Sequence, residues 1–320
     1  MLDGCGREID HLRLSLADHC NLACRYCVPS GARPSPSMID PSFAFELVKW
    51  LSVYHGIRHV RLTGGEPLLY GGLVPLVRRL ASLSGLREIT LTTNGQALSR
   101  LATPLCDAGL SRINVSLDTL DPKRFTQLTR GGCVEQTLKG IKAAVHAGLT
   151  PLKLNMVVQR GFNDGDIVTT AKWGLELGCI VRFLEVMPIG PLAHVIDKHL
   201  VPAAEIIKRL SECFTLKPLK QPLGQPAVDY AVRAGDLRGV IGVIAPTTRP
   251  FCERCRRIRI TARGSVVACV HDSRHHELND CWDGQRFDAA EADRILKNAI
   301  MEKPAKGPNS QTVTMISLGG

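Results

Sequence analysis

Three cysteines near the start of the chain have the spacing of a metal site. Cys20, Cys24 and Cys27 form a C-x3-C-x2-C motif on the loop that follows an apolar, strand-like segment, 11–16. A structural zinc ion normally takes four ligands, and a ferredoxin-type cluster also uses four cysteines. A [4Fe-4S] cluster held by only three thiolates keeps one iron free to bind a small molecule and pass it an electron. The spacing alone leaves a zinc knuckle or three buried thiols as alternatives.

A second set of three cysteines lies further along the chain. Cys252, Cys255 and Cys269 form a C-x2-C-x13-C motif. Two incomplete sets in one chain are hard to explain as core packing. The alternatives are one zinc ion shared by both sets, or a Cys3His zinc site that uses a histidine of the polar stretch 271–280.

The basic residues predict an anionic partner. The chain has a net charge of +10 and a pI near 9.1. Arg257 and Arg259 alternate on a strand-like segment, so both guanidinium groups point to one face and could clamp a phosphate or a purine. A solvated strand face is the alternative. Because aromatic residues are only 5% of the chain, too few for base stacking, a small polyphosphate fits better than nucleic acid.

The sequence also indicates the cellular compartment in which the protein works. It contains no run of about 18 apolar residues, so no membrane span is expected. Residues 1–10 have no apolar stretch typical of a secretory signal. Twelve cysteines without such a signal are typical of metal ligands or reduced thiols, so we predict a reducing cytoplasm.

Strand-like and helix-like segments alternate along the first 190 residues. The strand-like segments are 12–16, 60–63, 89–92, 113–117, 152–158 and 180–186. Helical periodicity is clearest over 43–54, 74–82, 134–147 and 167–177. Six β-then-α units predict parallel strands joined by right-handed crossovers. Because a closed barrel needs eight, we expect an α/β fold: an open, partial (β/α)6 TIM-like barrel with its site at the carboxyl ends of the strands.

Polar residues follow these strands where such a site would lie. Thr63-Gly64-Gly65-Glu66-Pro67 follows the second strand, 92–95 follows the third, and 114–118 ends the fourth. The Gly-Gly-Glu-Pro turn offers backbone groups and a carboxylate suited to gripping a ligand's ammonium group. An ordinary loop would also explain these glycines.

The pattern weakens beyond Pro188. Residues 191–242 are rich in proline and glycine, and they predict an irregular extension with one helix at 203–213. We therefore expect a partial barrel over residues 1–190 and a C-terminal extension over 191–320 that carries the second cysteine set. The terminal Gly319 and Gly320 could enter a crowded cavity, although fraying is the simpler explanation.

Together these motifs resemble the MoaA family. These are radical S-adenosylmethionine (SAM) enzymes of molybdenum cofactor biosynthesis, the GTP 3′,8-cyclases. The first cysteine triad and Gly-Gly-Glu-Pro are typical of the whole radical SAM superfamily, whereas the second triad, Arg-x-Arg and the terminal Gly-Gly narrow the resemblance to this branch. It runs from about Leu12 to Gly320, with departures at His19, Val28 and the loop 29–39.

The resemblance implies a role for each matching residue. It implies two [4Fe-4S] clusters, one held by Cys20, Cys24 and Cys27 and one by Cys252, Cys255 and Cys269. SAM contacts would fall on Tyr26, Gly65, Ser116 and Met187. GTP contacts would fall on Arg13, Arg61, Thr92, Lys153, Arg257, Ile258 and Arg259. Catalytic roles would fall on Arg257, Arg259, Gly319 and Gly320.

The resemblance also implies a reaction and partners. Reductive cleavage of SAM would give a 5′-deoxyadenosyl radical that abstracts the ribose 3′ hydrogen of GTP, and closure onto C8 would form 3′,8-cyclo-7,8-dihydro-GTP. The implied partners are GTP as substrate, an electron donor and, downstream, cyclic pyranopterin monophosphate synthase. We expect a monomer or homodimer that binds neither membrane nor nucleic acid. The alternatives are a radical SAM enzyme that modifies a peptide and a non-catalytic zinc or iron-sulfur protein that binds RNA.

Overall fold

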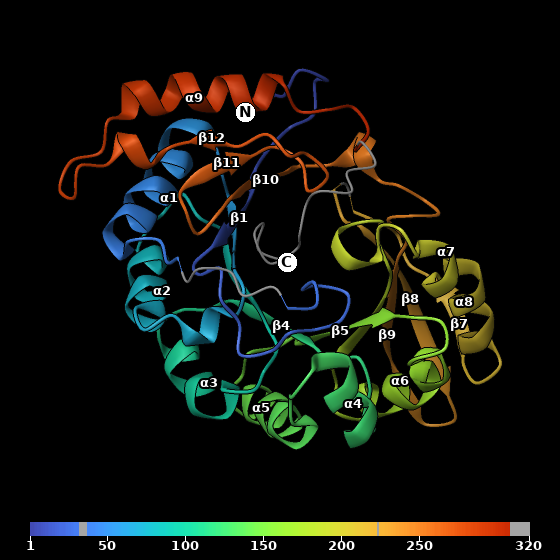
Figure 1. The fold of residues 1–320 in the computed structure, drawn as a ribbon. Coiled ribbons are helices and arrows are strands. Elements are labelled where there is room, and N and C mark those ends of the chain that lie inside the picture. Colours follow the sequence, from blue (N-terminus) through green and yellow to red (C-terminus); the bar gives the residue numbers. More distant parts are fainter. Residues whose placement is uncertain (32–36, 223, 308–320) are drawn as a thin grey trace.

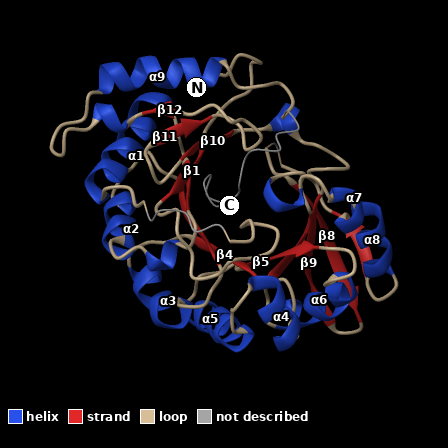
Figure 2. Ribbon diagram, in the orientation of Figure 1, coloured by secondary structure: helices blue, strands red, loops and turns tan. Residues whose placement is uncertain are grey.

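One curved sheet organises this computed structural model, which describes residues 1–31, 37–222 and 224–307. Within these residues the sheet has twelve strands, in the order β12-β11-β10-β1-β2-β3-β4-β5-β6-β9-β8-β7. Helices cover its outer side, and the strands surround a central space (Figures 1 and 2). No helix in the described part of the chain is long and apolar enough to cross a membrane.

The six predicted parallel strands form the middle of this sheet. They are β1 (His11–Ser15), β2 (His59–Thr63), β3 (Glu88–Thr93), β4 (Arg112–Ser116), β5 (Lys153–Val158) and β6 (Ile180–Glu185). Each pairs in parallel with the next. In β1, Leu12 and Leu14 are buried in the hydrophobic core, whereas Arg13 points the other way, into the barrel. The partial (β/α)6 barrel is therefore confirmed.

The crossover helices follow the strands in the expected order. They are α1 (Pro41–His55), α2 (Leu73–Ala81), α3 (Leu98–Asp107), α4 (Pro122–Thr129), α5 (Val134–His146) and α6 (Ile167–Glu176). Helix α1 shows why they begin and end where they do: the Asp40 carboxylate accepts from two backbone N–H groups of the first turn, and Gly56 ends the helix at a φ of 70°. The sequence analysis gave no range for α3, which contains Pro104, or for the short α4.

The C-terminal part of the chain continues the sheet. Its elements are α7 (Ile196–His199), α8 (Ala203–Ser211), β7 (Thr215–Pro218), β8 (Ala227–Ala234), β9 (Leu237–Ile244), β10 (Arg257–Ile260), β11 (Ser265–Val267), β12 (His276–Glu277) and α9 (Ala289–Met301). The prediction of an irregular extension was wrong for β8 and β9, which form an antiparallel pair of eight residues each. Gly242 lies within β9 opposite Asp229 of β8, and a Cβ there would lie 2.5 Å from the Asp229 side chain, so this strand position favours glycine.

Two of these late strands extend the parallel barrel on both sides. β10 pairs in parallel with β1, and β9 pairs in parallel with β6, so eight parallel strands stand side by side. The register places Arg13 opposite Arg61 of β2 and opposite Arg259 of β10. Three guanidinium-bearing residues from distant parts of the chain therefore lie in one row across the sheet.

Candidate active site inside the barrel

One cavity contains all six cysteines of the two triads. Its volume is about 340 Å³, and its walls include Cys20, Cys24 and Cys27 as well as Cys252, Cys255 and Cys269. The first triad follows β1, and the second flanks β10 and β11. Because β1 and β10 are parallel neighbours, the first triad lies beyond the carboxyl end of β1, whereas the second triad lies at the amino end of β10. The expected position at the carboxyl ends of the strands therefore holds for the first triad alone, and the cavity extends from one triad to the other.

The sulfur atoms are spaced too widely for a single zinc ion. Among the described residues, the only three potential ligand atoms that all lie within 4.8 Å of one another belong to Asp10, His11 and His59. Each triad therefore has at least one pair of sulfurs farther apart than this. Around a tetrahedral zinc ion with bonds of about 2.3 Å, thiolates lie about 3.8 Å apart. As they stand, these thiols therefore do not form a tetrahedral zinc site, whether from cysteines alone or from three cysteines and a histidine.

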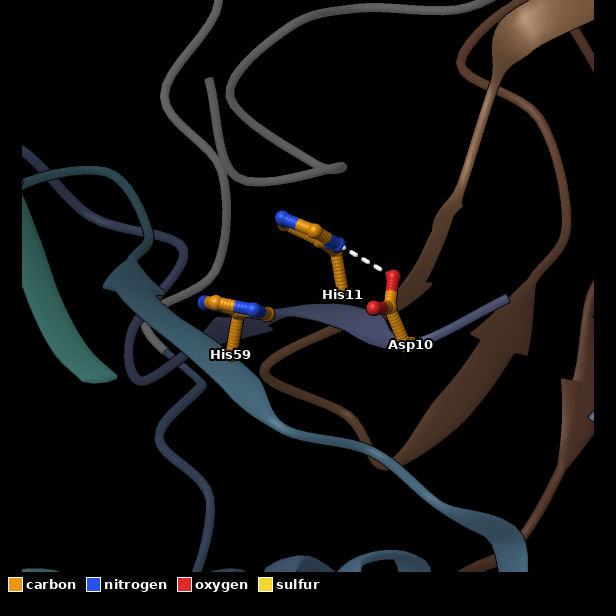
Figure 3. Close-up of side chains that lie close together, drawn as sticks. All are labelled: Asp10, His11 and His59. Carbon is orange, nitrogen blue, oxygen red and sulfur yellow. Dashed lines mark hydrogen bonds and ion pairs between the residues drawn. The ribbon is translucent and has the colours of Figure 1, made fainter. Parts of the chain in front are cut away.

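The Asp10, His11 and His59 group is not arranged around an ion either. The two imidazole rings are stacked, with centroids 4.3 Å apart and planes 14° apart (Figure 3). Ring-nitrogen lone pairs lie in the ring plane, so two nearly parallel rings cannot point them at one shared ion. The Asp10 carboxylate already accepts from His11 Nδ1 at 2.5 Å and from Arg256 Nε at 2.8 Å. This group therefore ties the starts of β1 and β2 to the segment before β10.

The three cysteines of the first triad are partly buried. Burial raises the pKa of Cys20 to about 11 and the pKa of Cys27 to about 12. The loop is fixed by backbone bonds, including Cys27 N to Cys24 O at 2.9 Å and Arg25 N to Leu128 O at 3.0 Å. Such thiols become thiolates when a bound cation compensates their charge, which is the behaviour of metal ligands.

The second triad has a more positive environment. Burial alone would raise the pKa of Cys255, but nearby Arg257 and Lys303 outweigh it and lower this pKa to about 6. A thiolate at Cys255 is therefore favoured even before a metal binds. The two triads thus differ in how much positive charge the protein places beside them.

The Gly-Gly turn packs directly against the chain that leads into Cys20. Gly65 N donates to Ala17 O at 2.6 Å, and Glu66 N donates to His19 O at 2.9 Å. A Cβ on Gly65 would lie 2.0 Å from His19 O, and one on Gly64 would lie 2.4 Å from Ala17 O. Only glycine permits this approach, so the turn positions the first triad.

Glu66 has a structural role that the Gly-Gly-Glu-Pro motif did not indicate. Its carboxylate is 2% exposed and accepts from Thr93 Oγ1 at 2.6 Å, Asn94 N at 2.7 Å and Leu68 N at 3.0 Å. Burial raises the pKa of Glu66 to about 7. These bonds join the turn after β2 to the end of β3, and the side chain still lines the cavity.

The four residues matched to SAM contacts all line the cavity: Tyr26, Gly65, Ser116 and Met187. The Tyr26 hydroxyl donates to Asp118 Oδ2 at 2.9 Å, while Asp118 Oδ1 accepts from Val157 N at 2.9 Å. Burial raises the pKa of Asp118 to about 6. Asp118 therefore holds the Tyr26 ring in place between the first triad and the ends of β4 and β5.

Positive charge dominates the cavity wall. Six cationic side chains face it, against two carboxylates, Glu66 and Glu185. The cations are Arg7, Arg13, Arg61, Arg257, Arg259 and Lys303. Burial, with the nearby arginines, lowers the pKa of Arg61 and of Arg259 to about 10. An excess of buried cations is suited to a polyanionic ligand.

The other three residues matched to GTP contacts, Thr92, Lys153 and Ile258, differ in their positions relative to the cavity. Thr92 lines the cavity. Lys153, 7% exposed at the start of β5, has its pKa lowered to about 7 by burial and by Arg182, Arg112 and Arg61. Ile258 is 1% exposed and packs in the hydrophobic core, so only its backbone can face a ligand. Gly319 and Gly320 lie outside the described residues, as does part of the loop 29–39.

Sequence reasoning missed two cations of the cavity wall, Arg7 and Lys303. Each is a single basic residue without a motif, and its partners are mostly backbone carbonyls from distant segments. No sequence signal could have identified them, because every residue type has a backbone carbonyl and such a partner therefore cannot be recognised from the sequence.

Two family models match the chain. Residues 14–174 match the radical SAM superfamily, and residues 179–308 match Molybdenum Cofactor Synthesis C. The chain is 41% identical over 318 residues to a GTP 3′,8-cyclase of Moorella thermoacetica, covering 96% of this chain and 94% of that protein. The chain belongs to the GTP 3′,8-cyclase family of radical SAM enzymes. A second member, from Pseudomonas putida, is 37% identical over 308 residues, with 95% and 91% covered.

Solved structures of two more distant proteins are similar to this chain in fold. Streptococcus suis SuiB bound to S-adenosylmethionine matches with a TM-score of 0.63 at 14% identity, covering 87% of this chain and 64% of SuiB. Methylornithine synthase PylB matches with a TM-score of 0.53 at 18% identity, covering 64% and 62%. At such identities the similarity is one of fold alone.

Proposed function

We propose that this protein is a GTP 3′,8-cyclase, which uses a radical derived from SAM to form 3′,8-cyclo-7,8-dihydro-GTP in molybdenum cofactor biosynthesis. The observation that carries the proposal is the single cavity walled by two three-cysteine sets and by six cations. Near relatives bear the name of this activity over nearly the whole chain. GTP has about four negative charges on its triphosphate, which the cationic wall balances.

The first triad fits a radical SAM cluster. Three partly buried cysteines face one cavity and would leave a cluster with an open coordination position. When bound, that cluster supplies the electron that cleaves SAM reductively. The protein's own part is to hold Tyr26, Gly65, Ser116 and Met187 around SAM and to exclude water from the reacting groups.

The second triad is proposed to hold a second [4Fe-4S] cluster beside GTP. Its support is the three thiols that face the cavity, the adjoining guanidinium groups, and the match of residues 179–308 to Molybdenum Cofactor Synthesis C. Arg257 and Arg259 would position the triphosphate and stabilise its charge, together with Arg13, Arg61, Thr92, Lys153 and the backbone of Ile258. Gly319 and Gly320 would assist the later step. In this proposal residues 1–190 supply the radical and residues 191–320 supply the second cluster and much of the GTP site.

The remaining partners stay predictions. The reaction needs an external electron donor, and its product would pass to cyclic pyranopterin monophosphate synthase. A cytoplasmic location and a monomeric or homodimeric state also belong to the proposal. An RNA-binding role is less suited to this site, because few aromatic side chains accompany the cations that line the cavity.

Anaerobic turnover tests the activity. Reconstituted protein should bind about eight irons per chain. With SAM, GTP and dithionite, mass analysis should find the cyclised nucleotide and 5′-deoxyadenosine. Unreacted GTP beside 5′-deoxyadenosine would refute the substrate assignment while keeping the radical chemistry. A colourless protein that retains zinc would refute both.

Lys153 should make GTP binding depend on pH. Free Lys153, with a pKa lowered to about 7, is mostly neutral at pH 8. Lys153 does not itself line the cavity, but Asn155, two residues further along the same face of β5, does, so a triphosphate bound there would raise that pKa again. Binding at pH 8 should therefore take up about one proton, and affinity should fall by up to about tenfold per pH unit above 7. Calorimetry in two buffers of different ionisation enthalpy measures this uptake.

A matched pair of variants assigns the proton. Lys153→Met should abolish the uptake, whereas Lys172→Met, on the exposed face of α6, should leave it unchanged. Heats that are independent of the buffer in the unmodified protein would contradict the assignment.

A further inference from the structure

Two buried cations hold the peptide backbone around the second cysteine triad. Lys303 lies just after α9 and is 4% exposed, and Arg7 lies before β1 and is 9% exposed. Both line the cavity that contains Cys252, Cys255 and Cys269. The family resemblance assigned neither of them to a cluster, to SAM or to GTP.

Lys303 joins the two arms of the β10–β11 hairpin where its ladder ends. The last cross-strand pair toward this end is Arg259 with Val267. Beyond it, Lys303 Nζ donates to Arg257 O at 2.7 Å and also to Ala268 O. One acceptor is two residues after Cys255, and the other immediately precedes Cys269. The ammonium group therefore fixes how far apart these two cysteines stand.

Arg7 holds the third cysteine in the same way. Its Nη1 donates to Cys252 O at 2.9 Å, and its Nη2 donates to Pro304 O at 2.9 Å. Its Nε pairs with the Asp3 carboxylate at 2.6 Å. Arg7 thus links the backbone of Cys252 to the residue that follows Lys303, so both cations belong to one support.

Among the described residues, the charge of Lys303 is met by the Cys255 thiolate and by no carboxylate. Arg7 is neutralised by Asp3, but no described carboxylate lies within ion-pair distance of Lys303 Nζ, whose partners are two carbonyl groups. A buried ammonium group is costly unless an anion compensates it. A [4Fe-4S] cluster in its 2+ state with three thiolates carries a net charge of −1, so it would supply that anion beside Cys255 and Cys269.

We propose that Lys303, supported by Arg7, is a positioning residue for the second cluster: it spaces Cys255 and Cys269 for binding and raises the reduction potential of the cluster. The inference rests on the proposed second cluster. A fixed positive charge favours the more negative, reduced form, so its removal makes the potential more negative.

Two substitutions at Lys303 distinguish its effect on the spacing of Cys255 and Cys269 from the effect of its charge. Lys303→Met removes both the donors and the charge, and it should bind about four irons per chain instead of about eight. The remaining first cluster, read from its absorbance and from SAM cleavage, shows that the barrel is folded. Lys303→Gln keeps an amide donor without the charge, so it should retain more iron. The matched control is Lys297→Met, on the exposed face of α9, which should behave as the unmodified protein.

A redox titration followed by electron paramagnetic resonance measures the second effect. It uses full-length chains in which Cys20, Cys24 and Cys27 are alanine, so that only the second cluster gives a signal. The Lys303→Gln midpoint should be more negative than that of the parent. An unchanged midpoint in Lys303→Gln would overturn the role of charge, and this comparison still decides if Lys303→Met does not fold.

The iron count separates this inference from the proposed function. If the unmodified protein binds about eight irons and Lys303→Met binds as many, the spacing role is overturned while the second cluster stands. If the unmodified protein itself binds only about four, the second cluster and this inference fall together.

Discussion

The Cys20→Ala variant should lose SAM cleavage, while Cys252→Ala should keep it and lose only the cyclised nucleotide. Substituting residues that merely orient metal ligands costs about 10–100-fold, so removing a ligand should cost more than about 100-fold. Both cysteines face one cavity, yet only the first set follows β1 and packs against the Gly-Gly turn. The measurement is 5′-deoxyadenosine and nucleotide product, quantified by mass from the same anaerobic reactions.

The exposed Cys213, which lies just after α8, provides the matched control. Cys213→Ala should bind about eight irons and turn over as the unmodified protein does. Equal loss of 5′-deoxyadenosine in Cys20→Ala and Cys252→Ala would mean that the two sets do not have separate tasks. The division of labour between them would then be wrong.

The Gly65→Ala substitution should impair the first triad, although it replaces none of its three cysteines. The added methyl group would lie 2.0 Å from His19 O, so the backbone before Cys20 must move. Overpacking of this kind costs about 1–3 kcal/mol of unfolding free energy. A displacement of about 1 Å in a reacting group can lower rates about 100-fold, so SAM cleavage should fall by that order.

Gly71→Ala tests whether any glycine substitution would do the same. Gly71 has no atom within 4 Å of a built Cβ and does not have a positive φ. The unfolding free energy of the Gly71→Ala variant, from urea titration of the apo protein, should differ from that of the unmodified protein by less than about 0.5 kcal/mol. If Gly65→Ala cleaves SAM as fast as Gly71→Ala does, the contact with His19 does not position the cysteine loop.

Local patterns predicted the barrel and the cysteine sets well. Each of β1 to β6 was found because alternating residues such as Leu12, Arg13 and Leu14 record which side chain faces the core and which faces the cavity. The thiol spacings worked for a similar reason, since ligands on one short loop must be close in sequence to be close in space.

Contacts between residues that are distant in the sequence could not be predicted from local patterns. β8 and β9 were missed because their pairing with each other and with β6 outweighs the presence of Gly239 and Gly242. Lys303 and Arg7 were missed because they bind backbone carbonyls, which every residue type possesses. Likewise, Glu66 was expected to meet a ligand, but the donors that engage it lie on Thr93, Asn94 and Leu68.

The pairing of β1 with β10 has a consequence for how the protein forms. Asp10 and Arg256, bonded at the start of this pair, are separated by 246 positions. During synthesis, the strand that leads to the first triad therefore has an open outer edge until residues 257–260 have emerged. Contacts of such long range are the slow ones in folding. Maturation with iron must wait for this closure if the cluster is to be shielded from oxygen as soon as it is loaded.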